Sequence, residues 1–186
     1  DYIVDIANKI IKEKKIKNFS NLEKIFEKLT AESLNYSMQM IKQNLTSLGI
    51  KHDVFTYESN LIKDNMVEKI IKNLKERKFV YEGTLEPPKG EATKTWKKRK
   101  QLLFKSSEFG DDIDRALKKE DGSWTYFAAD VAYHAHKVNR NFDFLINILG
   151  ADHAGYIKRI NSATRAVSNN KINLICKVSQ LVKLFK

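Results

Sequence analysis

The chain has 186 residues, of which 42% are hydrophobic, so it can bury a sizeable core, and this composition excludes a disordered protein. Its formal net charge of +11 indicates a polyanion partner such as nucleic acid, although a general abundance of lysine would give the same charge without a basic site. The sequence has no apolar run long enough to span a membrane, and its single Cys176 excludes an internal disulfide framework.

The first part of the chain is predicted to be helical. Isoleucines at helical spacing predict a helix within residues 1–17. Ser20 and Glu23 have the spacing of a capping box and predict that a second helix begins at Ser20. A further apolar stripe over residues 31–48 predicts a third helix, which Gly49 ends.

The middle of the chain is predicted to mix strands and helices. Residues 52–59 alternate enough to predict a short strand with Glu58 at its carboxyl end. A helix is expected over residues 65–77, and two further strands over 78–83 and 101–107.

The segment between those two strands contains both prolines of the chain and its densest positive run, Lys94 and residues 97–100. The two prolines and Gly90 predict an exposed loop. Such a loop could contact phosphates, with Trp96 as a stacking residue. A solvated loop without a partner explains the same residues, and both interpretations stay open.

The last third of the chain has the most regular pattern. Apolar flanks on either side of Asp121 and Gly122 predict a hairpin turn. Beyond it, the expected elements are a helix over 126–139, a strand over 142–150, a helix over 156–167 and a strand over 172–179. Strand, crossover helix and strand predict a βαβ unit with parallel pairing. Three aromatic residues of this part, Trp124, Phe142 and Phe144, are expected in the core.

Residues 150–156 follow the first strand of this unit, where parallel α/β sheets bind ligands. Gly150 and Gly155 permit a tight turn, Asp152 offers a carboxylate for sugar hydroxyls, and His153 offers a donor or a cation. This combination predicts a nucleotide site. Alternatively, Asp152 simply caps the helix that follows.

Tyr126 and Asp130 are spaced to project from one face of the predicted helix. A carboxylate among alanines is costly to desolvate unless a cation meets it, and a planar guanidinium suits both a carboxylate and a phenol ring. If that cation is a ligand, Glu58 could supply a second carboxylate. The alternative is an internal ion pair of Asp130 with Arg140 or Lys137.

Two other clusters have the residue types of metal ligands but not the spacing. Asp111, Asp112 and Asp114 fit neither an EF-hand loop nor a paired-carboxylate site. His134 and His136 are two residues apart, which places them on different faces of a helix. We expect no metal site.

Residues 105–163 closely resemble the bacterial arginyl-tRNA synthetases. They carry a Phe-Gly-Asp-Asp segment, a Thr-Tyr-x-x-x-Asp segment and a Gly-Ala-Asp-His segment in the order found in that family. The stretches 48–59 and 81–90 resemble the same family. The resemblance is strong over residues 46–186 and weaker over residues 1–45.

The resemblance implies an α/β fold with a partial Rossmann-like parallel sheet, flanked by helices and interrupted by insertions. It implies that Tyr126 and Asp130 recognise the arginine side chain, with Glu58 in the same pocket. The residues that it implies for the adenylate are Gly150, Asp152, His153 and Gln180. The implied partners are arginine, ATP with Mg²⁺ and tRNA(Arg), in a cytoplasmic monomer without a tightly bound cofactor.

The two signature motifs of class I synthetases, His-x-Gly-His and Lys-Met-Ser-Lys, do not occur in the sequence. We therefore expect the chain to be the middle of a longer enzyme and to be unable to activate arginine alone. The expected divisions are a helical insertion (1–30), a first catalytic piece (31–59), a second insertion with strands and the basic loop (60–123) and a second, βαβ catalytic piece (124–186). Alternatives are a basic nucleic-acid-binding module or an inactive synthetase paralogue.

Overall fold

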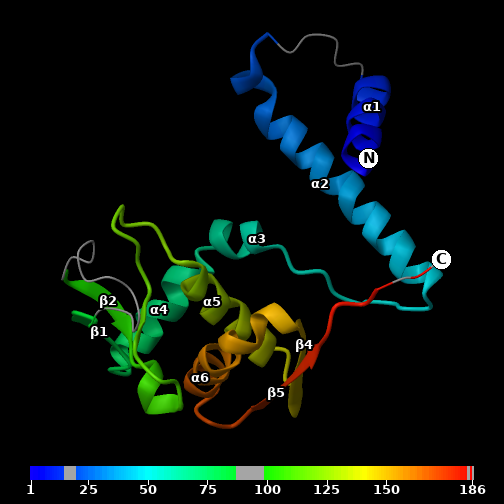
Figure 1. Cartoon of the computed structure of the whole chain (residues 1–186). Coiled ribbons are helices and arrows are strands. Elements are labelled where there is room, and N and C mark those ends of the chain that lie inside the picture. The colour runs from blue at the N-terminus through cyan, green and yellow to red at the C-terminus, as the bar shows by residue number, and fades with distance from the viewer. Residues whose placement is uncertain (15–19, 87–98, 184, 186) are drawn as a thin grey trace. The chain divides into compact units, whose positions relative to one another are not determined.

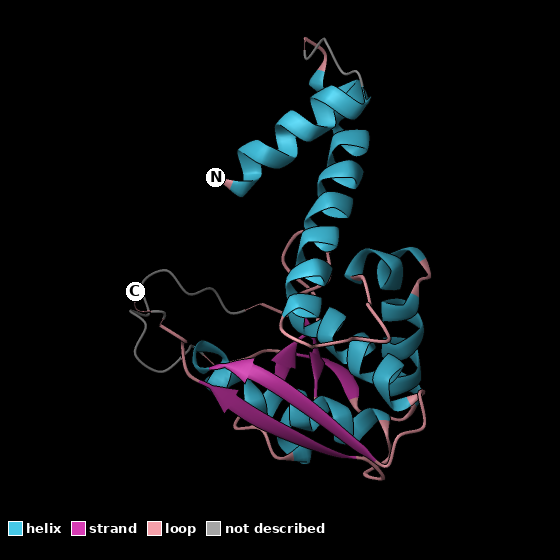
Figure 2. Ribbon diagram, turned by 90° about the vertical axis from the view of Figure 1, so that its right-hand side faces the viewer, coloured by secondary structure: helices cyan, strands magenta, loops and turns pink. Residues whose placement is uncertain are grey.

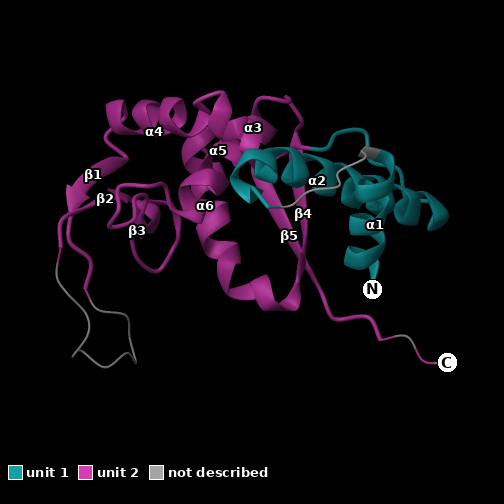
Figure 3. Ribbon diagram, turned by 90° about the horizontal axis from the view of Figure 1, so that it is seen from above, with its two compact units in different colours: residues 1–55 teal, residues 56–186 magenta. Residues whose placement is uncertain are grey.

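The computed structural model describes residues 1–14, 20–86, 99–183 and 185 (Figure 1). The chain forms two compact units, residues 1–55 and residues 56–186 (Figure 3). The predicted loop with Lys94 and Trp96 lies outside the described residues, so its contact with phosphates stays a prediction.

The first unit consists of two helices that contact each other, α1 (Tyr2–Lys14) and α2 (Leu22–Ser47). The predicted capping box at Ser20 is wrong, because the N-cap of α2 is Asn21, whose side chain accepts from the backbone N–H of Lys24. The predicted interruption near residue 31 is also wrong. Residues 22–47 contain neither glycine nor proline, so nothing ends the helix before Gly49, which has a φ of +73°.

The second unit contains a three-stranded antiparallel sheet of β1 (Val80–Gly83), β2 (Gln101–Phe104) and β3 (Arg115–Ala116). These strands and the helix α4 (Met66–Glu76) confirm the elements predicted for this region. The predicted hairpin is confirmed by an antiparallel bridge between Lys118 and Trp124, with Gly122 at a φ of +81° in its turn.

The strand predicted over residues 52–59 is wrong. These residues form no strand, and the helix α3 (Glu58–Lys63) begins at Glu58. In the described part of the chain no other strand pairs with residues 52–57, and an apolar alternation without a pairing partner does not make a strand.

The main core lies between the antiparallel sheet and three helices, α4, α5 (Tyr126–Val138) and α6 (Ile157–Val167), which lie side by side (Figure 1). Phe104 is fully buried; its ring stacks on Phe109 of the short helix η1 (Ser106–Phe109) and contacts Phe127 of α5. The predicted packing of Trp124 is confirmed, since it is partly buried against this cluster.

A second, parallel pair of strands, β4 (Phe144–Gly150) and β5 (Asn173–Ser179), confirms the predicted βαβ unit with α6 as its crossover (Figure 2). Leu145 and Leu174 pack against Ile160 of α6. The core positions predicted for Phe142 and Phe144 are wrong, because these side chains are 58% and 63% exposed. Alternate residues of a strand point to opposite faces, and α6 covers only one face of this pair.

The described chain is thus a mixed α/β protein with two small sheets. None of the helices in the described ranges combines the length and the apolar character that crossing a membrane requires. The predicted divisions at residues 30, 59 and 123 stay predictions. The helix α2 runs through the first of them, and the two compact units meet at residues 55 and 56.

Candidate functional site

A cavity of about 270 Å³ lies in the second unit, beside α3 and α5. Its lining comes from the segment that leads into α3, from α3 and from α5: Thr56, Glu58, Leu61, Tyr126, Ala129, Asp130 and Tyr133. The last four are spaced i, i+3, i+4 and i+7, which places them on one face of α5. The cavity thus brings together the three residues predicted to recognise a guanidinium.

The start of α5 is fixed by Thr125. The Thr125 hydroxyl donates to the carbonyl of Ala116 in β3 at 3.0 Å and accepts from the backbone N–H of Ala128 at 3.2 Å. This N-cap joins the first turn of the helix to the antiparallel sheet. The cap therefore sets the position of Tyr126, whose side chain is 78% exposed at the rim of the cavity.

Asp130 lies deeper in the cavity and is half-buried. Its Oδ2 accepts a hydrogen bond from the phenol of Tyr156 at 2.7 Å. Burial raises the pKa of Asp130, and the neighbouring charge of Glu58 raises it further. The hydrogen bond from Tyr156 and the positive charge of Lys137 oppose this shift without cancelling it.

The alternative of an internal ion pair finds no support among the described residues. The ammonium group of Lys137 donates to the side-chain oxygen of Asn147 at 2.6 Å, and Asp130 accepts from a neutral phenol. The carboxylate therefore retains an oxygen, Oδ1, that can meet a cation from outside. Two carboxylates and two phenol rings around one cavity fit a planar, forked cation better than a compact ammonium.

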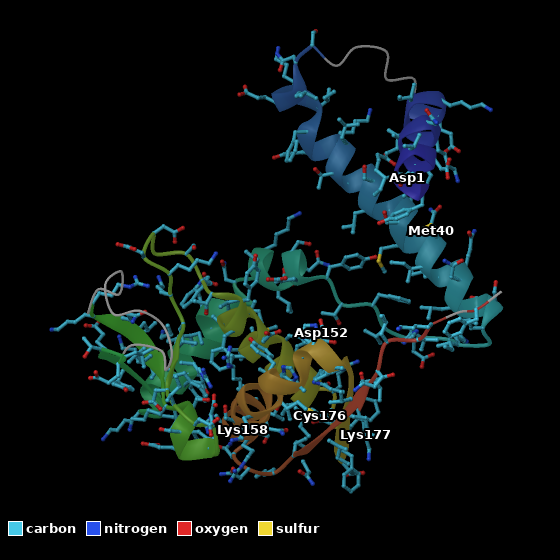
Figure 4. All side chains as sticks on the ribbon, in the orientation of Figure 1. Asp1, Met40, Asp152, Lys158, Cys176 and Lys177 are labelled. Carbon is cyan, nitrogen blue, oxygen red and sulfur yellow. The ribbon has the colours of Figure 1, made fainter. Side chains whose placement is uncertain are left out.

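The residues predicted to bind a nucleotide lie at one edge of the parallel strands. Gly150 ends β4 and pairs with Ser179 of β5, so Gln180 follows at the same edge. Asp152 and His153 lie in the short helix η2 (Ala151–Tyr156), which leads from β4 into α6 (Figure 4). All four predicted residues are exposed to solvent.

The capping role considered for Asp152 is not observed, because no side-chain hydrogen bond caps η2 or α6. The Asp152 carboxylate instead lies 3.5 Å from Nε2 of His153, within the same exposed turn. The side chains of the turn are therefore turned to solvent at the place where a ligand of a parallel sheet would bind.

The chain has relatives of known name that match it in sequence. No protein-family model matches the chain. The chain is 58% identical, over all of its 186 residues, to the arginine–tRNA ligase of Pelagibacter ubique, and 53% identical over 150 residues to that of Ehrlichia chaffeensis. The chain is homologous to a segment of the arginyl-tRNA synthetases. It spans about a third of the first relative, 32% of that protein, and 26% of the second.

Solved structures agree with this assignment. A Campylobacter jejuni protein assigned as an arginyl-tRNA synthetase superposes on 97% of the chain with a TM-score of 0.75 and 31% identity, and the chain covers 36% of it. The arginyl-tRNA synthetase of Plasmodium falciparum, at 17% identity and a TM-score of 0.60, shares the fold. The resemblance to arginyl-tRNA synthetases stated for residues 105–163 is confirmed.

Two tyrosines beside the predicted arginine pocket of this synthetase segment were missed in the sequence. Tyr133 lines the cavity and lies seven residues after Tyr126, so helical spacing alone could have identified it. Tyr156 lies 26 residues after Asp130, and no local pattern predicts their hydrogen bond.

A buried polar chain joins the other side of α5 to β4. Nδ1 of His134 lies 2.8 Å from the backbone carbonyl of Asp130, which can only accept, so Nδ1 carries the hydrogen. Nε2 therefore accepts from the amide of Asn147 at 3.1 Å. Both ring nitrogens are engaged, and among the described residues no group of three or more His, Cys, Asp or Glu side chains could hold a metal ion.

We predict a pH dependence of stability from this histidine. Burial lowers the pKa of His134 from its usual value near 6.5 to about 4, because the charged form would be desolvated. In the unfolded chain the same side chain takes up its proton near pH 6.5. The folded state therefore loses stability as the pH falls from about 6.5 to about 4, at up to roughly 1.4 kcal/mol per pH unit.

Chemical denaturation of wild type and His134→Gln across this pH range measures the effect. The variant should lack this part of the pH dependence, and the imidazole NMR signals of His134 in the folded protein should not titrate above pH 5. Titration of His134 near pH 6.5 would contradict the prediction.

Proposed function

We propose that the chain forms part of an arginine–tRNA ligase and contributes its arginine-binding pocket and one edge of its nucleotide site. The observation that carries this proposal is the cavity in which Glu58, Asp130 and Tyr126 meet without a basic residue of the chain among its lining. The relatives that share 58% and 53% of the sequence are named arginine–tRNA ligases, which supports the same assignment.

The guanidinium of arginine would lie between the carboxylates of Asp130 and Glu58. The Asp130 side chain offers Oδ1 from α5, while Glu58 begins α3 and lines the cavity from that helix. Tyr126 at the rim supplies an aromatic face for the flat cation. Lysine has no planar fork, so its ammonium group would satisfy fewer of these acceptors.

We further propose that β4 and β5 belong to a Rossmann-like parallel sheet whose edge holds the adenylate. Gly150, Asp152, His153 and Gln180 lie beyond the carboxyl ends of these two strands, which is where such sheets bind nucleotides. ATP is the second substrate and brings Mg²⁺ with its phosphates. The arginine carboxylate attacks the α-phosphate and pyrophosphate leaves, after which a ribose hydroxyl of tRNA(Arg) displaces AMP.

A chimeric enzyme tests this function. The chain replaces the matching segment of the Pelagibacter ubique ligase, to which it is 58% identical along its whole length. We expect the chimera to attach arginine to tRNA(Arg) and to lose that activity when Asp130 is replaced by asparagine. The 186-residue chain alone should not form arginyl-adenylate.

The control is the unaltered relative expressed and assayed in parallel. A folded chimera that fails to attach arginine, together with salt-dependent RNA binding by the 186-residue chain that Asp130→Asn leaves unchanged, would favour the nucleic-acid-binding module. A folded chimera that binds arginine but does not react would favour an inactive paralogue.

A further inference from the structure

A hydrogen bond joins the proposed arginine pocket to the proposed nucleotide edge. Tyr156 is the last residue of η2, the turn that follows β4, and its phenol donates to Oδ2 of Asp130 at 2.7 Å. The two residues belong to different elements and are 26 positions apart in the sequence. The bond is therefore a tertiary contact between the turn and the pocket.

The ring of Tyr156 is held firmly on the side of the turn. It packs against both hydrophobic clusters of the second unit, and the guanidinium of Arg159 lies 5.2 Å from its ring centroid. The preceding residues of the turn, 152–155, are exposed. A movement of the turn would therefore move a side chain that packs against the core and is bonded to Asp130.

Asp130 is equally constrained on the side of the pocket. Its Oδ2 is engaged by Tyr156, while its backbone carbonyl accepts from His134 on the same helix. Oδ1 and the second lone pair of Oδ2 remain for a ligand. A guanidinium that binds there favours the rotamer that Tyr156 already holds, so the ligand and the phenol stabilise the same arrangement.

We propose that Tyr156 is a positioning residue that couples the arginine pocket to residues 150–156, so that a ligand at either place raises the affinity at the other. This inference rests on the proposed function. Its physical basis is linkage. If the bond from Tyr156 forms in one arrangement of the turn and weakens in another, a ligand that prefers the first arrangement strengthens the bond, and the bond in turn favours that ligand. Tyr156 does not line the cavity and bonds to Asp130, so it acts through Asp130.

The test variant is Tyr156→Phe, which keeps the ring and its packing and removes only the hydroxyl. The chain contains a matched control, because the phenol of Tyr81 donates to Oδ2 of Asp114 at the same distance of 2.7 Å and neither residue lines the arginine pocket. Tyr81→Phe thus removes the same kind of hydrogen bond from the same unit.

The first measurement follows the backbone amide resonances of the 186-residue chain by NMR as arginine is added. In wild type and in Tyr81→Phe, we expect the resonances of Gly150, His153 and Gly155 to shift in parallel with those of the pocket residues. In Tyr156→Phe the pocket resonances should still shift, and the response of residues 150–155 should be lost.

The second measurement uses the chimeric enzyme and compares arginine binding with and without a non-hydrolysable ATP analogue. We expect the analogue to tighten arginine binding at least about fivefold in wild type and in Tyr81→Phe, and to leave it unchanged in Tyr156→Phe. Reciprocal titrations of the analogue should give the same ratio.

The outcomes separate this inference from the proposed function. If wild type binds no arginine at all, the proposed function fails. If wild type binds arginine but shows no coupling, or if Tyr156→Phe keeps both responses, the coupling is overturned and the pocket assignment stands. If the ATP analogue leaves the arginine affinity of wild type unchanged, the inference is overturned even when Tyr156→Phe does not fold.

Discussion

Replacement of Asp130 by asparagine is expected to weaken arginine binding at least about 100-fold, equivalent to roughly 3 kcal/mol, without destabilising the fold. The guanidinium would lose its half-buried ionic partner and would keep only the carboxylate of Glu58. The amide oxygen of the variant can still accept from Tyr156, so the hydrogen bond that supports the side chain survives.

The direction in which Asp130→Asn changes the stability follows from the pKa of Asp130. Burial and Glu58 raise the pKa of Asp130, which means that its ionised form is less favourable in the folded than in the unfolded chain. The stability that this raised pKa contributes is complete below the unfolded pKa and is lost as the pH rises through the folded pKa. At neutral pH, Asp130→Asn should therefore unfold at the same or a higher denaturant concentration than wild type.

Calorimetric titration with arginine and denaturation by urea measure these two effects. The control is Asp112→Asn, because Asp112 is an exposed acid whose side chain bonds to Lys158 at 2.7 Å outside the pocket. This control should bind arginine as wild type does. If Asp130→Asn bound arginine within threefold of wild type, Asp130 would not be the partner of the cation.

Replacement of Arg115 by alanine is expected to cost about 3–5 kcal/mol of stability, because it leaves the carboxylate of Asp111 buried without a cation. The Asp111 side chain is fully buried, and Arg115 donates to both of its oxygens, at 2.6 and 2.7 Å. Ser106 also donates to Asp111 and lies 2.5 Å from the hydroxyl of Ser162. This network joins η1 to α6, the crossover helix of the βαβ unit.

The pKa of Asp111 reflects this balance. Burial by itself would raise the pKa, but the hydrogen bonds from Arg115 and Ser106 outweigh burial and lower it. The network's contribution to stability is therefore present above the ordinary pKa of an aspartate and is lost as the pH falls through the lowered value. Wild type and Arg115→Ala should differ most in stability at neutral pH.

Urea denaturation near pH 7 measures the cost. The control is Lys158→Ala, which removes the partner of the exposed Asp112 and should leave the stability close to that of wild type, because solvent screens an exposed ion pair. The double variant Arg115→Ala/Asp111→Ala should be more stable than Arg115→Ala alone, since it removes the stranded charge. A cost below about 1 kcal/mol for Arg115→Ala would show that water reaches Asp111 freely.

The regular elements of the second unit could be predicted because their patterns are local. The helices α4, α5 and α6 carry clear apolar periodicity, and the hairpin turn has its aspartate and glycine. The strand predicted over residues 52–59 failed because a strand also needs a partner, which periodicity does not supply. The core position predicted for Phe144 was wrong for a related reason, since the sequence does not tell which face of a strand pair is covered.

The residues of the candidate site also divide into those that local spacing predicts and those that only the tertiary packing brings together. Helical spacing places Tyr126 and Asp130 on one face and extends to Tyr133, so local geometry accounts for the wall that α5 forms. Glu58 was predicted as a second carboxylate at the end of a strand, and the family resemblance implied the same pocket; the structure brings it to the cavity, but at the start of a helix. The bond from Tyr156 depends on how α6 and η2 pack against α5, which no spacing rule describes.

The most direct test of the account compares arginine with citrulline, which has the same length and a neutral urea group in place of the guanidinium. Calorimetric titration of the chain near pH 7.5 should detect arginine binding, and citrulline should bind at least roughly 100-fold more weakly, because it leaves two carboxylates without a cation. Equal affinity for the two ligands, or no binding of arginine, would contradict the assignment of this cavity.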